Sequence, residues 1–421
     1  MSITAAAVIS SLLLILGAPL FLVIGAFSSL CMLGEGYPLA MMAQQMFSIT
    51  EKEALLAIPF FVTAATLMTK GESAGRIMDF INSLIDWLPG GLALASIASC
   101  IFFAALSGLS PTAIIAVGAL ACPALVRSRY PERFSIGLLT SAGSLGILVP
   151  PSIVVIIFGI MGEVNIQHLF LAALTPILII AAMFSAFSVA LSIRLRIARN
   201  PFSPKRVLDS LRKGVLALLS TGIIAGIYLG WFSVTQASAL IAAYALAIEL
   251  LAYRKVRLRH LPELFRRSAT VTGMILVIIS VAMSFNWFLT VQGVPFRVSG
   301  FITDHVSSPI AFLALVNLFL LALGCIMDIL SAIFITVPLL LPAAVAMGID
   351  PVHFGIVFIV NFEIGYLTPP IGINLFTSSA VFRRSLLDVA GSVLPFLGLL
   401  LAALVLVTYF PSLSLWTLNG I

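Results

Sequence analysis

The sequence has little charge for its length. Of its 421 residues only 9% are Asp, Glu, Lys or Arg, whereas 61% are hydrophobic. So few charged residues cannot cover the surface of a soluble domain of this length. We therefore expect an all-α protein that crosses a membrane several times. Stretches close to the roughly 20 residues that span a bilayer contain no charge at all, as in residues 11–33, 177–193 and 389–407.

The sequence also lacks several common signatures. Its first 30 residues contain no Lys or Arg, which argues against a cleaved signal peptide with a basic start. The four cysteines have no paired spacing and lie in apolar runs, which argues against disulfides and thiolate metal sites. The four histidines fall at the ends of expected spans or in loops, which weakens any haem, metal or catalytic-dyad interpretation.

The basic residues that are present give a topology. The net charge is +6, and 20 of the 22 Lys and Arg lie in five groups, at 70–76, 127–133, 194–213, 254–267 and 383–384. Short basic loops of this kind mark the cytoplasmic side of a membrane protein, and they do not form a nucleic-acid-binding surface. No nucleic-acid partner is therefore expected.

With those loops inside, we predict ten transmembrane helices in two inverted repeats. The first repeat (1–193) crosses at 3–17, 20–33, 54–69, 135–162 and 168–193. After a cytoplasmic linker (194–213), the second repeat (214–421) crosses at 215–231, 237–252, 268–290, 354–382 and 385–410. Because five is an odd number, the second repeat starts on the opposite side from the first, and both termini lie outside.

Two segments, 90–126 and 309–346, begin and end on one side of the membrane. The arms of the first would be only about 22 and 21 Å long as helices, against a hydrocarbon core of roughly 30 Å. We interpret both segments as re-entrant hairpins, and the alternative is a pair of thin spans. Residues 77–88 have helical apolar spacing, which fits a helix lying on the cytoplasmic surface or the start of a longer helix.

One phrase occurs twice, as Gly-Ile-Leu-Val-Pro-Pro at 146–151 and Gly-Tyr-Leu-Thr-Pro-Pro at 365–370, with an offset of 219 residues. Proline has no N–H and interrupts a helix, so both 135–162 and 354–382 should be broken near mid-membrane. Duplicated, interrupted hydrophobic segments point to the central binding site of a transporter.

The four interruptions should converge. The hairpin tips at 107–112 and 324–331 and the breaks at 144–152 and 365–370 supply hydroxyls and free carbonyl oxygens without formal charge. Such ligands suit sodium better than zinc or copper, and the duplication predicts two sodium sites. Helix N-termini near 110–113 and 331–333 would favour an anionic substrate.

Asp328 and Glu363 are the acidic residues that sit deepest in apolar sequence. Charges in such positions are costly and are usually functional or paired. Asp328 could cap the helix that follows it or help to balance a cation. Glu363 could be linked to a proton or could be a structural partner of another group.

These features resemble the large membrane subunit of tripartite ATP-independent periplasmic (TRAP) transporters. The resemblance extends over nearly the whole chain and is most specific in two stretches, Gly-Ile-Asp-Pro-Val-His-Phe-Gly at 348–355 and Leu-Thr-Pro-Pro-Ile-Gly-Ile-Asn-Leu-Phe at 367–376. It implies an elevator-type importer in the bacterial inner membrane, driven by sodium and specific for an organic acid. It also implies two partners, a small four-helix membrane subunit and a periplasmic substrate-binding protein.

The resemblance further implies specific ligands. The first sodium site would use Ser107, Ser110, Gly146, Val149 and Pro150. The second would use Gly324, Gly365 and Thr368. We expect the substrate at Ser107, Thr112, Ser152 and Asn374.

Two departures from the family pattern are visible. Leu109 and Pro111 interrupt a tip that usually reads Ser-Gly-Ser-Ser, and Gln236 stands where an acidic residue is common. One alternative function is a related ion-coupled carboxylate transporter that works without a binding protein. The other is an intramembrane enzyme with Ser107 or Ser110 as nucleophile, but such a serine needs a positioned base and no histidine is expected at membrane depth.

Overall fold

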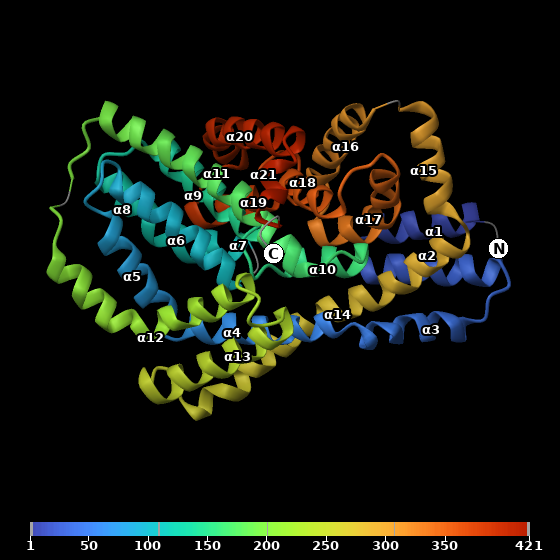
Figure 1. Cartoon of the computed structure of the whole chain (residues 1–421), viewed down its shortest axis with the longest axis horizontal. Coiled ribbons are helices and arrows are strands. Elements are labelled where there is room, and N and C mark those ends of the chain that lie inside the picture. The colour runs from blue at the N-terminus through green and yellow to red at the C-terminus, as the bar shows by residue number, and fades with distance from the viewer. Residues whose placement is uncertain (1–2, 108–109, 200, 307, 419–421) are drawn as a thin grey trace.

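The computed structural model describes residues 3–107, 110–199, 201–306 and 308–418. Within these residues all regular secondary structure is helical, and there are no strands (Figure 1). Eight of these helical segments are long and apolar enough to cross a membrane, and further apolar helices have 10–17 residues. The prediction of an all-α, multi-pass membrane protein is therefore confirmed.

The first half of the chain runs from α1 to α11. Its helices are α1 (Ile3–Ile15), α2 (Leu20–Gly34), α3 (Leu39–Phe47), α4 (Ala57–Lys70), α5 (Ser73–Ile85), α6 (Gly91–Ser107), α7 (Ser110–Ala113), α8 (Ala119–Arg127), α9 (Glu132–Ser144), α10 (Ile153–Gly162) and α11 (Ile166–Arg194).

The second half repeats this order. Its helices are α12 (Pro204–Tyr228), α13 (Val234–Ala247), α14 (Leu261–Val291), α15 (Val294–His305), α16 (Pro309–Gly324), α17 (Ile329–Ala346), α18 (Pro351–Gly365), α19 (Ile373–Phe382), α20 (Leu386–Tyr409) and α21 (Ser412–Leu415). In both halves a short helix (α5, α15) leads into a hairpin (α6–α8, α16–α17), a broken helix (α9–α10, α18–α19) and a long helix (α11, α20).

The helices pack as two bundles, which meet where α4 packs against α6 and α14 against α17. In the first bundle α4 packs against α13 and α14, and α14 also packs against α2. In the second, α9 packs against α20, α16 against α18, and α10 against α17. Aromatic rings fill the interior of the second bundle, where the ring of Phe396 lies 5.2 Å from that of Phe184 and 5.8 Å from that of Phe134.

The segments predicted as hairpins consist of α6–α8 and α16–α17, and their returning arms are among the eight segments long enough to cross a membrane. The second hairpin turns at residues 325–328, between α16 and α17. The returning arm of the first hairpin contains a π-helical turn, Ile114–Gly118, between α7 and α8, which the sequence did not suggest. The tip residues 108 and 109, Leu109 among them, lie outside the described residues.

Several short elements differ from the prediction. The surface helix expected at 77–88 is a separate helix, α5, that begins four residues earlier. Its counterpart α15 was not predicted. Helix α12 begins at Pro204, inside the expected linker, and the Ser203 hydroxyl accepts a hydrogen bond from the Arg206 amide at 3.3 Å. Gln236 completes a capping box with Ser233 at the start of α13.

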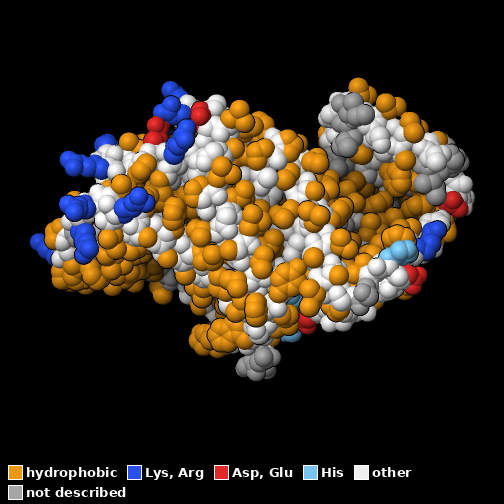
Figure 2. Space-filling view, turned by 90° about the horizontal axis from the view of Figure 1, so that it is seen from above, with side chains coloured by type: hydrophobic (Ala, Val, Ile, Leu, Met, Phe, Trp, Pro, Cys, Tyr) orange, Lys and Arg blue, Asp and Glu red, His pale blue; other side chains and the backbone are white. Residues whose placement is uncertain are grey.

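On the face drawn in Figure 2 the charged side chains lie mainly toward the two ends of the long axis of the molecule. Figure 2 shows Lys and Arg gathered at the end that Figure 1 identifies by the beginning of α12 and the end of α8. The middle of this face is largely hydrophobic. The side of the membrane on which these basic residues lie stays a prediction.

Candidate functional site

The two proline pairs lie where the broken helices are interrupted. Helix α9 ends at Ser144, a 3-10 turn follows at Leu145–Ile147, and α10 begins at Ile153. Helix α18 ends at Gly365 and α19 begins at Ile373. Proline cannot donate to a helical carbonyl, which frees backbone oxygens at both breaks. Both Pro-Pro bonds, 150–151 and 369–370, are cis.

The first break packs tightly against the first hairpin. A Cβ on Gly146 would lie 1.7 Å from the Cβ of Ala104 in α6, so only glycine permits this contact. Helix α7 also packs against the turn that contains Gly146. The Ser110 side chain is 1% exposed, and its hydroxyl has no hydrogen-bond partner among the described residues. An orphaned buried hydroxyl of this kind needs an explanation, and an ion is one.

The second break packs against the second hairpin through two glycines. A Cβ on Gly365 would lie 2.6 Å from the Cα of Gly324. The Ile371 amide donates a 3.1 Å hydrogen bond to the Cys325 carbonyl, and the Ile329 amide donates one of the same length to the Tyr366 hydroxyl. Hairpin tip and break therefore form one unit.

Thr368 lies within this second unit. Its side chain is half-buried, and its hydroxyl donates to the Ile364 carbonyl at 2.9 Å. A hydroxyl that donates one bond keeps lone pairs for a cation. Of the eight predicted sodium ligands, Gly324, Gly365 and Thr368 are thus brought together, whereas Ser107 ends α6 with a side chain outside the described residues.

The remaining first-site residues line the same turn. Pro150 is buried and Val149 is half-buried. Within the described residues no group of three or more His, Cys, Asp or Glu could hold a metal ion. The donors at the breaks include hydroxyls and backbone carbonyls, which are ligands that suit a hard monovalent cation.

The two breaks differ in exposure. Pro150 and Pro151 are buried, whereas Pro369 and Pro370 are exposed. The proline pair is therefore more exposed at the second break than at the first.

The residues expected to bind substrate have different surroundings. Ser152 is buried, and its hydroxyl donates to the Ile147 carbonyl at 2.5 Å and accepts from the Val155 amide at 3.4 Å, as the N-cap of α10. Asn374 is fully buried in the first turn of α19, and neither of its side-chain amide atoms has a partner among the described residues. Thr112 is half-buried in α7.

The two deep acidic residues have distinct contacts. Asp328 caps α17, accepting from the Ser331 amide at 3.0 Å and from the Ser331 hydroxyl. Glu363 is fully buried; its Oε1 accepts from the Ser144 hydroxyl at 3.1 Å, and its Oε2 has no partner among the described residues.

The first half of the first broken helix, α9, packs against the second half of the second broken helix, α19. The hydroxyls of Thr140 in α9 and Ser378 in α19 lie 2.8 Å apart and are buried. At the exposed end, Arg384 pairs with Glu132 at 2.6 Å, and that hydrogen-bonded carboxylate raises the pKa of the Arg384 guanidinium. Residues of both repeats therefore hold the two breaks in one body. The Thr140–Ser378 and Glu132–Arg384 contacts were not identified from the sequence. Tyr366 was not identified either, although it directly follows Gly365 in the repeated phrase.

A nucleophilic role for Ser110 has no support in this arrangement. Its hydroxyl meets no base among the described residues. His353, the buried histidine, is engaged elsewhere, with Nδ1 2.7 Å from the Ser414 hydroxyl and Nε2 3.2 Å from the Thr408 carbonyl.

Comparison with known proteins gives a consistent family. The family model described as "Tripartite ATP-independent periplasmic transporter, DctM component" matches residues 7–413. The C4-dicarboxylate TRAP transporter large permease protein DctM of Pseudomonas aeruginosa is 40% identical over 379 residues, covering 89% of this chain and 88% of that protein. Its namesake from Rhodobacter capsulatus is 36% identical over 400 residues, covering 90% of each chain.

A solved structure shares the fold. The crystal structure of the YdaH transporter of Alcanivorax borkumensis superimposes with a TM-score of 0.60, covering 88% of this chain and 85% of that one, at 13% sequence identity. At this identity the likeness concerns the fold alone.

Proposed function

Because this chain belongs to the DctM family of TRAP transporters, as a large permease component, we propose that it carries an organic acid across the bacterial inner membrane together with sodium ions. The observation that carries this proposal is the pairing of each broken helix with a hairpin tip, through Gly146 and Ala104 on one side and Gly365 and Gly324 on the other. Two such polar interruptions in apolar surroundings would be costly without bound ions or substrate.

Two sodium ions occupy the two breaks in this proposal. The first binds the hydroxyls of Ser107 and Ser110 and the carbonyls of Gly146, Val149 and Pro150. The second binds the carbonyls of Gly324 and Gly365 and the hydroxyl of Thr368. The unpartnered Ser110 hydroxyl and the packing of each tip on its break support these assignments.

The substrate carboxylate binds near the beginning of α19. Four helices begin at the interruptions. Asp328 already caps α17 and Ser152 caps α10, and the residue before α7 lies outside the described residues. Helix α19 begins after Gly372 and receives no side-chain cap from the described residues. Its amide end carries partial positive charge, and the unpartnered Asn374 amide lies in its first turn. Thr112 and Ser107 complete the site from the first hairpin.

Transport uses an elevator movement of the second bundle (α6–α11 and α16–α20) against the first (α1–α4 and α12–α14). The joined α9 and α19 and the two hairpin contacts support movement of both breaks as one unit. A separate small four-helix membrane subunit completes the immobile part, and a periplasmic binding protein delivers the acid.

The test is uptake into proteoliposomes that contain the large and small subunits. Labelled C4-dicarboxylates, sugar acids and keto acids are offered with and without the binding protein and an inward sodium gradient. We expect uptake of one acid, and this uptake should require both the binding protein and the sodium gradient. Uptake that needs sodium but no binding protein would indicate the stand-alone carrier, and uptake of an acid without sodium would overturn the two ion sites.

A further inference from the structure

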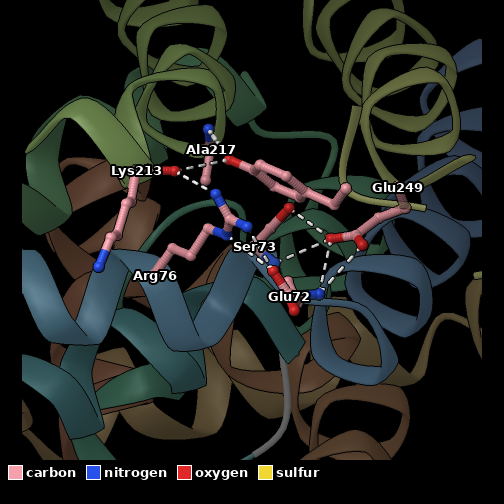
Figure 3. A network of polar contacts seen from close by, with 7 residues as sticks. Glu72, Ser73, Arg76, Lys213, Ala217 and Glu249 are labelled. Carbon is pink, nitrogen blue, oxygen red and sulfur yellow. Dashed lines mark hydrogen bonds and ion pairs between the residues drawn. The ribbon is translucent and has the colours of Figure 1, made fainter. Parts of the chain in front are cut away.

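A buried carboxylate outside the two breaks joins the second half of the chain to the first. Glu249 is fully buried in the π-helical turn Ile248–Ala252, which directly follows α13. Its carboxylate accepts hydrogen bonds from the Glu72 amide at 3.0 Å, the Ser73 amide at 2.8 Å and the Ser73 hydroxyl at 2.5 Å (Figure 3). All of these hydrogen bonds come from the N-cap and the first residue of α5, which are 177 and 176 residues away in sequence.

The local sequence of α5 is adapted to this external cap. The N-cap residue Glu72 makes no capping bond of its own, because its carboxylate pairs with Arg76 at 2.6 Å. A Cβ on Gly71 would lie 2.0 Å from the Glu249 Cδ, so only glycine lets the carboxylate approach. A negative group at a helix N-terminus accepts hydrogen bonds from the free amides and interacts favourably with the positive end of the helix dipole.

A second set of contacts holds the same turn to α12. The Arg76 guanidinium donates to the Lys213 carbonyl at 2.7 Å and lies 3.9 Å above the centre of the Tyr253 ring. The Tyr253 hydroxyl in turn accepts from the Ala217 amide at 3.1 Å. Figure 3 shows these groups converging on the beginning of α5.

The rest of α5 follows α12 as well. The hydroxyls of Ser83 and Ser210 lie 2.7 Å apart, and Asp86 pairs with Arg206 at 3.1 Å. Directly after α5, Gly90 has φ +77° and α6 of the first hairpin begins at Gly91. The chain can therefore change direction between a helix bound along its length and the hairpin that follows.

The equivalent helix of the second repeat has no such cap. Helix α15 begins after Gly293 at φ +65°, and none of the described side chains caps it. The two helices that lead into the hairpins are thus held differently, and the first is held by a residue of the opposite repeat.

We propose that Glu249 is a positioning residue for transport. Its carboxylate fixes the beginning of α5 to α13, so that α5 stays with the immobile bundle and bending is confined to the turn between Asp86 and Gly91. Without this cap, displacement of the first hairpin would also pull α5 from α12. This inference rests on the elevator movement proposed above.

Two variants test the anchor from opposite sides. Glu249→Gln removes the charge and turns an amide donor toward the α5 amides. Gly71→Ala keeps the charge but places a methyl group where the carboxylate lies. The matched controls are Glu263→Gln, an exposed glutamate paired with Arg266 and Arg267, and Gly75→Ala, where a Cβ would meet nothing within 4 Å.

Hydrogen exchange of the segment 71–76 and sodium-driven uptake are measured on the same preparations. We expect both test variants to exchange about tenfold faster there, as for loss of a helix cap. Their maximal uptake rate should fall about tenfold, with the half-saturating sodium concentration unchanged, because the ion sites are not touched. Both controls should behave as the wild-type protein.

The outcomes separate the two proposals. If wild-type uptake shows no sodium dependence, the proposed function fails, whereas the exchange data still report whether Glu249 caps α5. If exchange accelerates and the uptake rate stays at the wild-type value, the positioning role is wrong. Unchanged exchange in both test variants would show that the cap does not hold α5. A rise in half-saturating sodium without a fall in maximal rate would also overturn the proposal.

Discussion

The hydroxyl of Ser144 donates a 3.1 Å hydrogen bond to the carboxylate of Glu363, and the two residues are separated by 219 positions. This separation equals the offset between the two proline-containing breaks. Equivalent positions of two repeats can touch only near the axis that relates them. The Ser144–Glu363 contact therefore lies near the pseudo-two-fold axis, between the two broken helices.

Ser144 and Glu363 should be energetically coupled. Ser144→Ala removes the hydroxyl that donates to the buried Glu363 carboxylate, which should cost about 1–3 kcal/mol of stability. In a cycle with Glu363→Gln, the effects on thermal unfolding should be non-additive by about 1 kcal/mol or more. Additive effects would mean that the contact contributes nothing to stability.

Gly365→Ala should disrupt the second break. The new methyl group would lie 2.6 Å from the Gly324 backbone, which must then shift, and overpacking of this kind costs about 1–3 kcal/mol. Sodium-dependent uptake should be lost. Gly391→Ala in α20, where nothing lies within 4 Å, is the matched control and should retain wild-type uptake.

Thr368→Val should weaken the second sodium site while the protein still folds. The variant loses one hydroxyl, and its bond to Ile364 is worth about 1 kcal/mol. We expect the half-saturating sodium concentration for uptake to rise about tenfold, a difference of about 1.4 kcal/mol. A sodium dependence identical to the wild-type curve would remove Thr368 from the site.

Asn374→Asp should impair substrate binding. The change keeps the shape of the side chain but places a negative charge at the N-terminal turn of α19, where the substrate carboxylate is proposed to bind. The KM for the acid should rise at least about tenfold through like-charge repulsion, whereas sodium binding measured without substrate should be retained. Asn374→Ala should give a smaller increase, and an unchanged KM in both variants would place the acid elsewhere.

The sequence predicted the features that depend on local signals. Proline pairs located both interruptions, and apolar runs located the long helices. The ends of elements that depend on distant partners were less well predicted. Helix α5 begins at Ser73 and not at Ile77 because Glu249, a residue of the other repeat, caps it.

Helix α15 and the first turns of α12 were not predicted, because their sequence signals are weak or ambiguous. Helix α15 is short and is interrupted by Arg297, Asp304 and His305, so its apolar spacing is not evident. The start of α12 carried a local signal, Ser203 followed by Pro204, but the basic residues around it favoured a loop. For the site, the sequence predicted which glycines belong together, whereas the Tyr366 contact and the cap on α5 required the fold.

The tip of the second hairpin also provides a built-in reporter. Cys31, Cys100 and Cys122 are buried, whereas Cys325 is partly exposed and its carbonyl is bonded to the second break. A thiol-reactive dye should therefore modify the native protein first at Cys325. The modification rate, followed with and without sodium, would monitor closure of this hairpin without any engineered label.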